Sequence, residues 1–226
     1  MENPRLIQTN NLKKGIELLD EAKLENKLYY FVGGTGIGKT TIFNYYQRTH
    51  PDTLVTNIKP AEPASYFYAK LLCQISGEDF SLIFNNSQKR IHNFIEEASF
   101  EILEKTQIKL LIIDEIGNFK RQFIPYLRQI SDNISHKCGI ILASPPDFKD
   151  RLLYWSNKGV PGISEVLTRI NYTHEFLSPS FDDIQKLCVS YNISRKKVWH
   201  WIYRNSDNMR TAINYIIAYL NGRLEI

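Results

Sequence analysis

The sequence predicts an α/β fold in which helices flank a parallel β-sheet, followed by a small C-terminal helical module. Runs that are almost wholly apolar, such as 27–32, 109–113 and 139–143, alternate with longer segments that have helical spacing. Strands buried on both faces have this appearance, and strands that alternate with helices form parallel sheets. Beyond residue 178 only short helical segments follow. We therefore expect two domains, an α/β domain at 1–177 and a helical domain at 178–226.

Apolar spacing and helix start and stop signals predict the elements of the α/β domain. Leu12, Ile16 and Leu19 recur at helical spacing after the possible N-cap Thr9, and Pro51 closes a later helix. The remaining elements follow from the apolar runs and the segments between them. The expected strands are 27–32, 54–58, 109–113, 139–143 and 170–176, and the expected helices are 10–25, 40–50, 66–75, 88–105 and 123–135.

The C-terminal domain is expected to hold three short helices. Ser180 caps the first, with Asp183 in the capping-box position, and Ser194 caps the second. The third runs from about 208 to 221 and has Gly222 as its stop. Each of the three helices thus has a start or stop signal of its own.

Composition restricts the class of protein. The chain has 226 residues, of which 43% are hydrophobic and 23% charged, with a formal net charge of +4. No run approaches the roughly 20 apolar residues that a membrane span needs, and no apolar segment follows the charged start. Cys73, Cys138 and Cys188 lie far apart without zinc-type spacing, which argues against a structural zinc site and a disulfide framework. We expect a cytoplasmic protein with no membrane partner.

Positive charge is concentrated in the C-terminal domain. Residues 178–226 carry seven Lys or Arg against four Asp or Glu, while the rest of the chain is close to neutral. A basic module on a neutral body suits a polyanionic partner, but a solvated helix face has the same composition. The sequence leaves both interpretations open.

A phosphate-binding motif follows the first expected strand. It fits the pattern G-x-x-x-x-G-K-[ST] at every fixed position and consists of Gly33, Gly34, Thr35, Gly36, Ile37, Gly38, Lys39 and Thr40, with Thr41 next in the helix. Glycines allow successive backbone N–H groups to surround an anion, and the helix N-terminus adds partial positive charge. Lys39 then reaches the β- and γ-phosphates. The motif predicts a P-loop that binds ATP.

A second motif supplies the groups that a P-loop needs for hydrolysis. The apolar run 110–113 ends in Asp114 and Glu115. Because parallel strands end at the same edge of a sheet, these carboxylates are expected beside the P-loop. The Thr40 hydroxyl would ligate Mg²⁺, and Asp114 would hold the ion through water. Glu115 would polarise the attacking water as a general base, which distinguishes a hydrolase from a nucleotide binder.

With both motifs placed, the chain resembles an AAA+ ATPase over nearly its whole length. In that family a polar residue at the end of the next strand senses the γ-phosphate, and Ser144 of Leu-Ala-Ser-Pro-Pro matches it. An arginine near the end of the large domain reaches a neighbouring subunit's site, and Arg169 of Leu-Thr-Arg-Ile matches it. A helical lid supplies a second sensor arginine, which is Arg210 here. The resemblance implies that Lys39, Glu115, Ser144 and Arg169 act in catalysis and that Arg210 contacts the nucleotide.

Each of these three positions has a second interpretation. Ser144 also suits the start of a Pro-Pro turn, and Arg151 competes with Arg169 for the role in a neighbouring site. Arg210 would form only a weak surface ion pair if it paired with Asp207. The sequence alone does not decide between these interpretations.

Within the AAA+ ATPases, the compact plan resembles the DNA-transposition regulators of the MuB, TnsC and TniB type. The features in common are the short entry into the first strand, the Leu-Ile-Ile-Asp-Glu box, the Leu-Thr-Arg-Ile box and the small lid. This resemblance implies a head-to-tail homo-oligomer, either a ring or a helical filament, that coats double-stranded DNA without reading sequence and recruits a transposase. The N-terminal DNA-binding extension of MuB is missing from this sequence.

The residues expected to face DNA are basic. The candidates are Lys59, Lys70, Lys89, Arg90, Arg195, Lys196 and Lys197. The last three stand beside Trp199 and Trp201, and cations interleaved with aromatics grip phosphates and stack on bases. The alternative is that Val198, Trp201 and Ile202 form the core of the lid and the cations are a solvated face.

Two rival functions share the predicted site. A replication-type AAA+ ATPase that loads or remodels a helicase would act through a protein partner. A nucleotide-gated scaffold would bind ATP and never hydrolyse it, and Glu115 argues against this second alternative.

Overall fold

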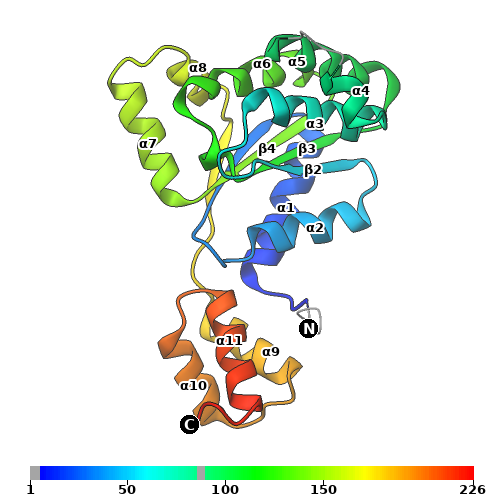
Figure 1. The fold of residues 1–226 in the computed structure, drawn as a ribbon. Helices are drawn as coiled ribbons and strands as arrows, with labels where there is room; N and C mark the ends of the chain where they lie inside the picture. The colour runs from blue at the N-terminus through cyan, green and yellow to red at the C-terminus, as the bar shows by residue number, and fades with distance from the viewer. Residues whose placement is uncertain (1–5, 86–89) are drawn as a thin grey trace.

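A computed structural model describes residues 6–85 and 90–226. The body is a five-stranded parallel sheet flanked by helices, and a three-helix lid follows it (Figure 1). The strands are β1 (Leu28–Val32), β2 (Thr53–Asn57), β3 (Leu110–Asp114), β4 (Gly139–Ser144) and β5 (Tyr172–Glu175). The body helices are α1 (Asn10–Glu25), α2 (Lys39–Thr49), α3 (Ala64–Ser76), α4 (Phe80–Asn85), α5 (Ile91–Phe100), α6 (Pro125–Ile134), α7 (Pro146–Asn157) and α8 (Ile163–Leu167).

The strand order brings the two predicted motifs to one edge of the sheet. The order is β2-β3-β4-β1-β5, and every neighbouring pair is parallel. At the carboxyl edge Val32 of β1 lies beside Ser144 of β4, while Asn57 of β2 lies beside Asp114 of β3. The P-loop after β1 therefore opens where β3 and β4 end, as the rule for open α/β sheets predicts.

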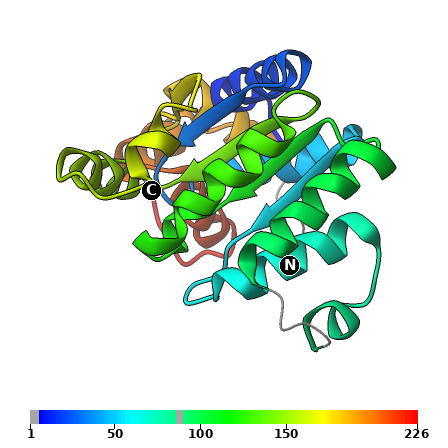
Figure 2. The same cartoon turned by 90° about the horizontal axis from the view of Figure 1, so that it is seen from above.

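Each face of the sheet has its own core because successive strand side chains point to opposite faces. Tyr29 and Phe31 of β1 pack with α1 and α2, whereas Tyr30 and Val32 pack with α3, α5, α6, α7 and α8. Figure 2 shows helices along both sides of the sheet. The inner strands β1, β3 and β4 are buried along their whole length because both faces are covered, whereas the edge strand β5 is mostly exposed.

The lid packs around its own small core. Its helices are α9 (Phe181–Ser190), α10 (Lys196–Asn205) and α11 (Met209–Leu220). Ile184, Val198, Trp199 and Ile202 are among its buried residues, and Trp201 is only partly buried. Val198 and Ile202 thus belong to this core, as one of the two interpretations of the sequence expected, and Trp201 packs against it. The buried indole is Trp199, whose Nε1 donates to the Ile193 carbonyl at 2.8 Å.

A buried carboxylate joins the lid to the body. Asp183 is 3% exposed and forms the expected capping box with Ser180 at the start of α9. Its other oxygen, Oδ1, accepts from the backbone N–H of Asn10, the first residue of α1, at 3.0 Å. The Asn11 side chain also donates to the Leu177 carbonyl at 2.8 Å. One carboxylate thus satisfies the N-termini of two helices, which stabilises negative charge there.

The structure confirms the predicted strands and most predicted helices, with three differences. Residues 88–105 do not form one helix; α5 ends at Phe100 and a π-helical turn continues over Glu101–Lys105. Ser194 does not cap the second lid helix, because Arg195 occupies that position in an extended conformation without a side-chain hydrogen bond. Helices α4, α7 and α8 were not predicted. The proposed boundary at 177/178 falls in the connection between β5 and α9 and remains a prediction.

No helix within residues 6–85 and 90–226 has the length and apolar composition needed to cross a membrane.

Helix α1 passes close to the sheet at Gly139. A methyl group at this position would lie 2.2 Å from the Ala22 carbonyl oxygen of α1. The neighbour is backbone, so it cannot rotate away as a flexible side chain would. Glycine at the start of β4 therefore sets how closely α1 packs.

We expect Gly139→Ala to lower the free energy of unfolding by about 1–3 kcal/mol, the usual cost of overpacking a core. Denaturant titration of the purified chain measures this change. Ser135→Ala, at an exposed position shortly before β4, is the control and should change stability by less than about 0.5 kcal/mol. A Gly139→Ala protein as stable as wild type would show that α1 does not lie this close to β4.

Candidate nucleotide site

The P-loop is held between β4 and the lid. The Gly33 N–H donates to the Ser144 carbonyl at 3.1 Å, which anchors the start of the loop to β4. Gly36 and Gly38 have φ values of 79° and 111°, a region that residues with a side chain rarely adopt. Gly38 is the N-cap of α2. The loop therefore ends at a helix N-terminus, the arrangement that binds anions.

Lys39 is a cation buried beneath the loop. Its residue is 6% exposed, and its ammonium donates to the carbonyls of Gly33 and Gly34. Burial lowers the pKa of Lys39, while Asp114 and Glu115 act in the opposite direction. An ammonium has three donors and two are in use. A phosphate would supply the ionic partner that neutral carbonyls do not, so the environment favours anion binding.

Thr40 and Asp114 are brought together from α2 and β3. The Thr40 hydroxyl donates to Asp114 Oδ2 at 2.6 Å, across 74 residues of sequence, and Asp114 is 1% exposed. Mg²⁺ is usually bound through one or two side-chain oxygens together with substrate phosphates. A hydroxyl and a carboxylate next to a P-loop fit that pattern, so Thr40 and Asp114 would hold the ion.

Glu115 leaves β3 in an unusual backbone conformation. Its φ and ψ are 57° and 38°, in the left-handed region, and its N–H donates to Asp114 Oδ1 at 2.8 Å. Non-glycine residues in this region carry strain, which is often found at functional sites. Burial and the charge of Asp114 raise the pKa of Glu115, while Lys39 and Arg210 lower it. The Glu115 carboxylate thus interacts electrostatically with Lys39 of the P-loop, Asp114 of β3 and Arg210 of the lid.

The N-terminus of α11 lies directly against the P-loop. The Arg210 N–H donates to the Gly36 carbonyl at 3.2 Å. A methyl group on Gly36 would lie 2.7 Å from Asn208 Oδ1 and 2.9 Å from Arg210 Cβ. The alternative pairing of Arg210 with Asp207 is not formed, since among the described residues Asp207 accepts from Asn208 Nδ2 at 2.7 Å instead. Arg210 therefore stands where the lid meets the loop.

Ser144 is placed at the predicted strand end, but its hydroxyl is engaged elsewhere. The residue is fully buried; its hydroxyl lies 2.5 Å from the Tyr30 hydroxyl and donates to the Pro145 carbonyl at 2.9 Å. Burial raises the pKa of Tyr30 to about 12, so the phenol stays protonated. To contact a phosphate, the Ser144 side chain would have to leave these partners. Its sensor role remains a prediction.

Arg169 lies at the amino edge of the sheet, before β5, and pairs with Asp132 of α6. Its Nε donates to Asp132 Oδ1 at 2.6 Å and its Nη2 to Oδ2 at 3.3 Å. Arg128 binds the same carboxylate at 3.1 Å, and these arginines hold the pKa of Asp132 low. The alternative residue, Arg151, pairs with Asp147 and lies over the Phe148 ring. Arg169 is 42% exposed and far from its own P-loop in the sheet, so any catalytic contact would be with another subunit.

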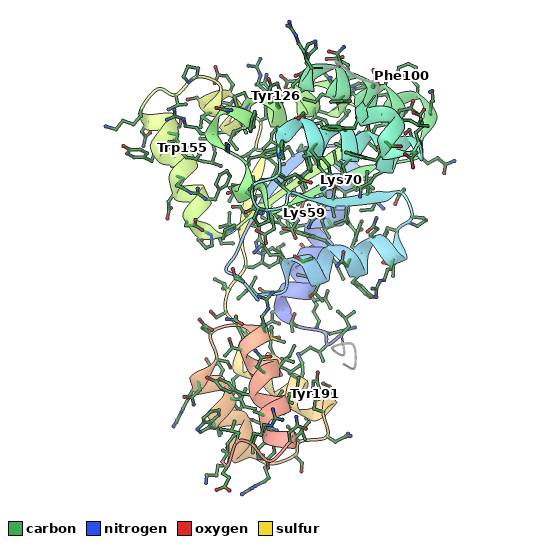
Figure 3. The ribbon with its side chains drawn as sticks, viewed as in Figure 1. Lys59, Lys70, Phe100, Tyr126, Trp155 and Tyr191 are labelled. Atoms are coloured by element: carbon green, nitrogen blue, oxygen red, sulfur yellow. The ribbon has the colours of Figure 1, made fainter. Side chains whose placement is uncertain are left out.

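The remaining predicted site residues fall into three groups. Within the P-loop, Ile37 is buried and Thr35 is exposed, and Thr41 is exposed on the first turn of α2. Lys59 and Lys70 lie on the body, apart from the lid (Figure 3), and Lys70 pairs with Glu62 at 3.0 Å. The other basic candidates described by the structure are exposed: Arg90 precedes α5, and Arg195, Lys196 and Lys197 start α10. Lys89 lies outside the described residues.

The family described as "AAA domain" matches residues 23–152, more than half of the sequence. The chain belongs to this family. The match covers both phosphate motifs and the sheet through β4, and the observed parallel sheet confirms the predicted P-loop α/β fold. A search of the curated proteins found no match.

Solved structures extend the likeness of this AAA domain protein through the lid. The Orc1 protein of Aeropyrum pernix in complex with DNA matches with 14% identity, 99% coverage of this chain, 63% of that chain and a TM-score of 0.63. Cdc6p of Pyrobaculum aerophilum matches with 14% identity over 98% of this chain and 65% of that chain, and with a TM-score of 0.64. AMPPCP-bound DnaA of Aquifex aeolicus matches with 18% identity over 96% of this chain and 63% of that chain, and with a TM-score of 0.61. This chain spans less than two thirds of each, and at these identities the likeness shows the fold alone.

Sequence reasoning missed several residues that the structure places around the site. Tyr30 binds Ser144, Asp132 binds Arg169, and Asn208 both caps α11 and contacts Gly36. Asp183 was predicted only as part of a local capping box and also binds α1. The pairs Tyr30–Ser144, Asp132–Arg169 and Asp183–Asn10 join residues far apart in sequence, so local spacing carried no signal for them. The cap at Asn208 is local, and its residue type was the available signal.

We expect Arg210→Ala to raise the pKa of Glu115, because the lid cation that lowers it is removed. A carboxyl ¹³C NMR titration measures this pKa, with Glu115→Gln assigning the resonance. Arg210→Lys keeps the positive charge and should leave the pKa close to wild type. Equal Glu115 pKa values in wild type, Arg210→Ala and Arg210→Lys would show that Arg210 does not act on this carboxylate.

Proposed function

We propose that this AAA domain protein hydrolyses ATP, assembles head to tail on double-stranded DNA and recruits a transposase to it. The observation that carries the ATPase part is the convergence of Lys39, the Thr40–Asp114 pair and Glu115 at one edge of the sheet. The parts on DNA and transposase rest on the resemblance of the sequence boxes to transposition regulators and on the basic surfaces.

Hydrolysis would use the site residues in separate roles. Lys39 and the loop N–H groups bind the phosphates, while Thr40 and Asp114 hold Mg²⁺, which neutralises phosphate charge. Glu115 accepts the proton of the attacking water, and its raised pKa makes it a better proton acceptor than an ordinary surface carboxylate. As the pH falls through this raised pKa, Glu115 becomes protonated and turnover is lost. Arg210 places a positive charge on the lid side of the same space.

Assembly would complete the site with Arg169 of a neighbouring subunit. Exposed ion pairs contribute about 0–1 kcal/mol, so releasing Arg169 from Asp132 costs little. Arg128 binds the same carboxylate and would remain as its partner after Arg169 leaves. A contact in which one surface of each subunit meets a different surface of the next forms rings or filaments. Cooperative turnover would then depend on protein concentration.

We expect Arg169→Ala and Glu115→Gln to be inactive alone and to restore turnover when mixed. In the mixture, an Arg169→Ala subunit still has Glu115 and receives the arginine of its Glu115→Gln neighbour. Steady-state phosphate release at several mixing ratios measures this effect. Arg128→Ala removes the other arginine bound to Asp132 and should keep its activity. If the mixture stays inactive, Arg169 does not act in a neighbouring site.

We expect ATP to be required for binding to random-sequence duplex DNA, with filaments or rings visible by negative-stain imaging. Lys39→Ala should lose nucleotide binding, DNA binding and assembly together. Glu115→Gln should keep binding and form more persistent assemblies, because hydrolysis would be the step that disassembles them. Fluorescence anisotropy with labelled duplex and a phosphate-release assay provide the measurements.

Two outcomes would favour the alternatives. Equal turnover by wild type and Glu115→Gln would indicate a nucleotide-gated scaffold that does not hydrolyse ATP. Loss of all DNA binding with every nucleotide would exclude the transposition proposal. The AAA+ ATPase that acts through a protein partner, as in helicase loading, would then be the favoured alternative.

A further inference from the structure

Helix α10 has one buried face and one basic face. Val198, Trp199 and Ile202 are buried in the lid core. The helix and its N-cap contain no Asp or Glu, and their exposed residues include Arg195, Lys196, Lys197, His200, Tyr203 and Arg204. An amphipathic helix with a face of this composition is typical of a surface that binds a polyanion.

The cations on this face lack acidic partners. Among the described residues, neither Arg195, Lys196, Lys197 nor Arg204 takes part in a salt bridge. Other basic side chains of the molecule are paired, such as Lys186 with Asp182 on the neighbouring helix α9. All four cations of α10 and its N-cap are therefore available to an external partner, whereas about half of the basic side chains described on the body are held in ion pairs.

The spacing along α10 fits double-stranded DNA. Residues 196, 200, 203 and 204 lie on one side of an α-helix. With a rise of 1.5 Å per residue, Lys196 and Arg204 are about 12 Å apart along the axis, close to the width of the major groove. His200 and Tyr203 lie between them on the same face, and the Phe181 ring of α9 stacks against His200 at 4.6 Å. Cations at both ends would meet phosphates on opposite sides of the groove.

The helix is rigidly presented. A five-residue connection at 191–195 joins α9 to α10 and includes Asn192 with a φ of 61°. The Trp199 indole N–H donates to the Ile193 carbonyl in this connection at 2.8 Å, and Trp201 packs edge-on to Tyr215 of α11. Figure 1 shows α10 at an outer side of the lid. A short helix held in this way is suited to entering a groove as a unit.

We propose that α10 is the DNA-docking helix of this protein and lies in the major groove of a duplex. Arg195, Lys196, Lys197 and Arg204 bind phosphates of the two strands, and His200 and Tyr203 face the groove floor. This inference rests on the proposed DNA binding. The inference assigns the main DNA contact to the lid, rather than to Lys59 and Lys70 of the body. It also adds His200, Tyr203 and Arg204 to the residues that contact DNA.

The test measures duplex affinity of the full chain with saturating ATP and Mg²⁺ by fluorescence anisotropy over a range of salt concentrations. Lys196→Gln/Arg204→Gln should weaken binding at least tenfold. Two lost phosphate contacts should also reduce the slope of log K against log salt by about 1.8. Lys186→Gln/Arg223→Gln removes the same charge elsewhere on the lid and should leave the slope unchanged. Both variants should keep the wild-type melting temperature and nucleotide affinity.

Chemical protection tests the groove. Dimethyl sulfate methylates guanine N7 in the major groove, so bound wild type should protect it, and Tyr203→Ala should reduce that protection at equal occupancy. Protection confined to the minor groove would overturn the assignment. The assignment would also be overturned if Lys196→Gln/Arg204→Gln kept the wild-type slope of log K against log salt while Lys59→Gln lost duplex affinity. That result would leave the proposed DNA binding intact. Absence of duplex binding by wild type would overturn both proposals.

Discussion

The parallel register of β1, β4 and β3 determines where every group of the nucleotide site lies. Since all three strands run in the same direction, their carboxyl ends meet at one edge, and each ends in a loop that carries one part of the site. The hydrogen bond from Gly33 to the Ser144 carbonyl and the bond from Thr40 to Asp114 connect these loops across the edge. A shift of one residue in either pairing would turn Asp114 or Ser144 to the other face.

The site gathers charges that are costly to bury unless they are paired. Lys39 and Asp114 are almost completely buried, and Glu115 is half-buried beside them. The buried Lys39 ammonium is held by carbonyls, and the buried Asp114 carboxylate is held by one hydroxyl and one backbone N–H. Both charges are incompletely compensated, because neutral partners do not restore all of the lost hydration. A phosphate on the loop and a divalent cation on Thr40 and Asp114 would each supply the missing opposite charge. The electrostatics of these side chains therefore favour a metal–phosphate ligand over a neutral one.

Much of the fold and the centre of the site could be predicted from the sequence, because both depend on local patterns. Fully apolar strands and a motif of fixed spacing are visible without tertiary knowledge. Helix α7 escaped prediction because only Phe148 and Leu152 of its twelve residues are buried, so its apolar periodicity is weak. Ser194 was a reasonable cap by residue type, but the extended backbone of Arg195 starts α10 one residue later. The pairs Tyr30–Ser144 and Asp132–Arg169 join distant segments, and only the folded sheet and helices bring them together.

Among the described residues, hydrogen bonds attach the lid to the body at the N-termini of α9 and α11, and the second of these lies at the P-loop. At one, Asp183 binds the N-terminus of α1 while capping α9; at the other, the N-terminus of α11 bonds to Gly36 of the P-loop. Ile184, Val198 and Ala212 of the three lid helices share one core, so a shift of α10 would disturb its packing against α11. A phosphate that repositions Gly36 would therefore act on the whole lid, including the basic face of α10. This rigid connection provides a physical route by which nucleotide and DNA would influence each other through the lid.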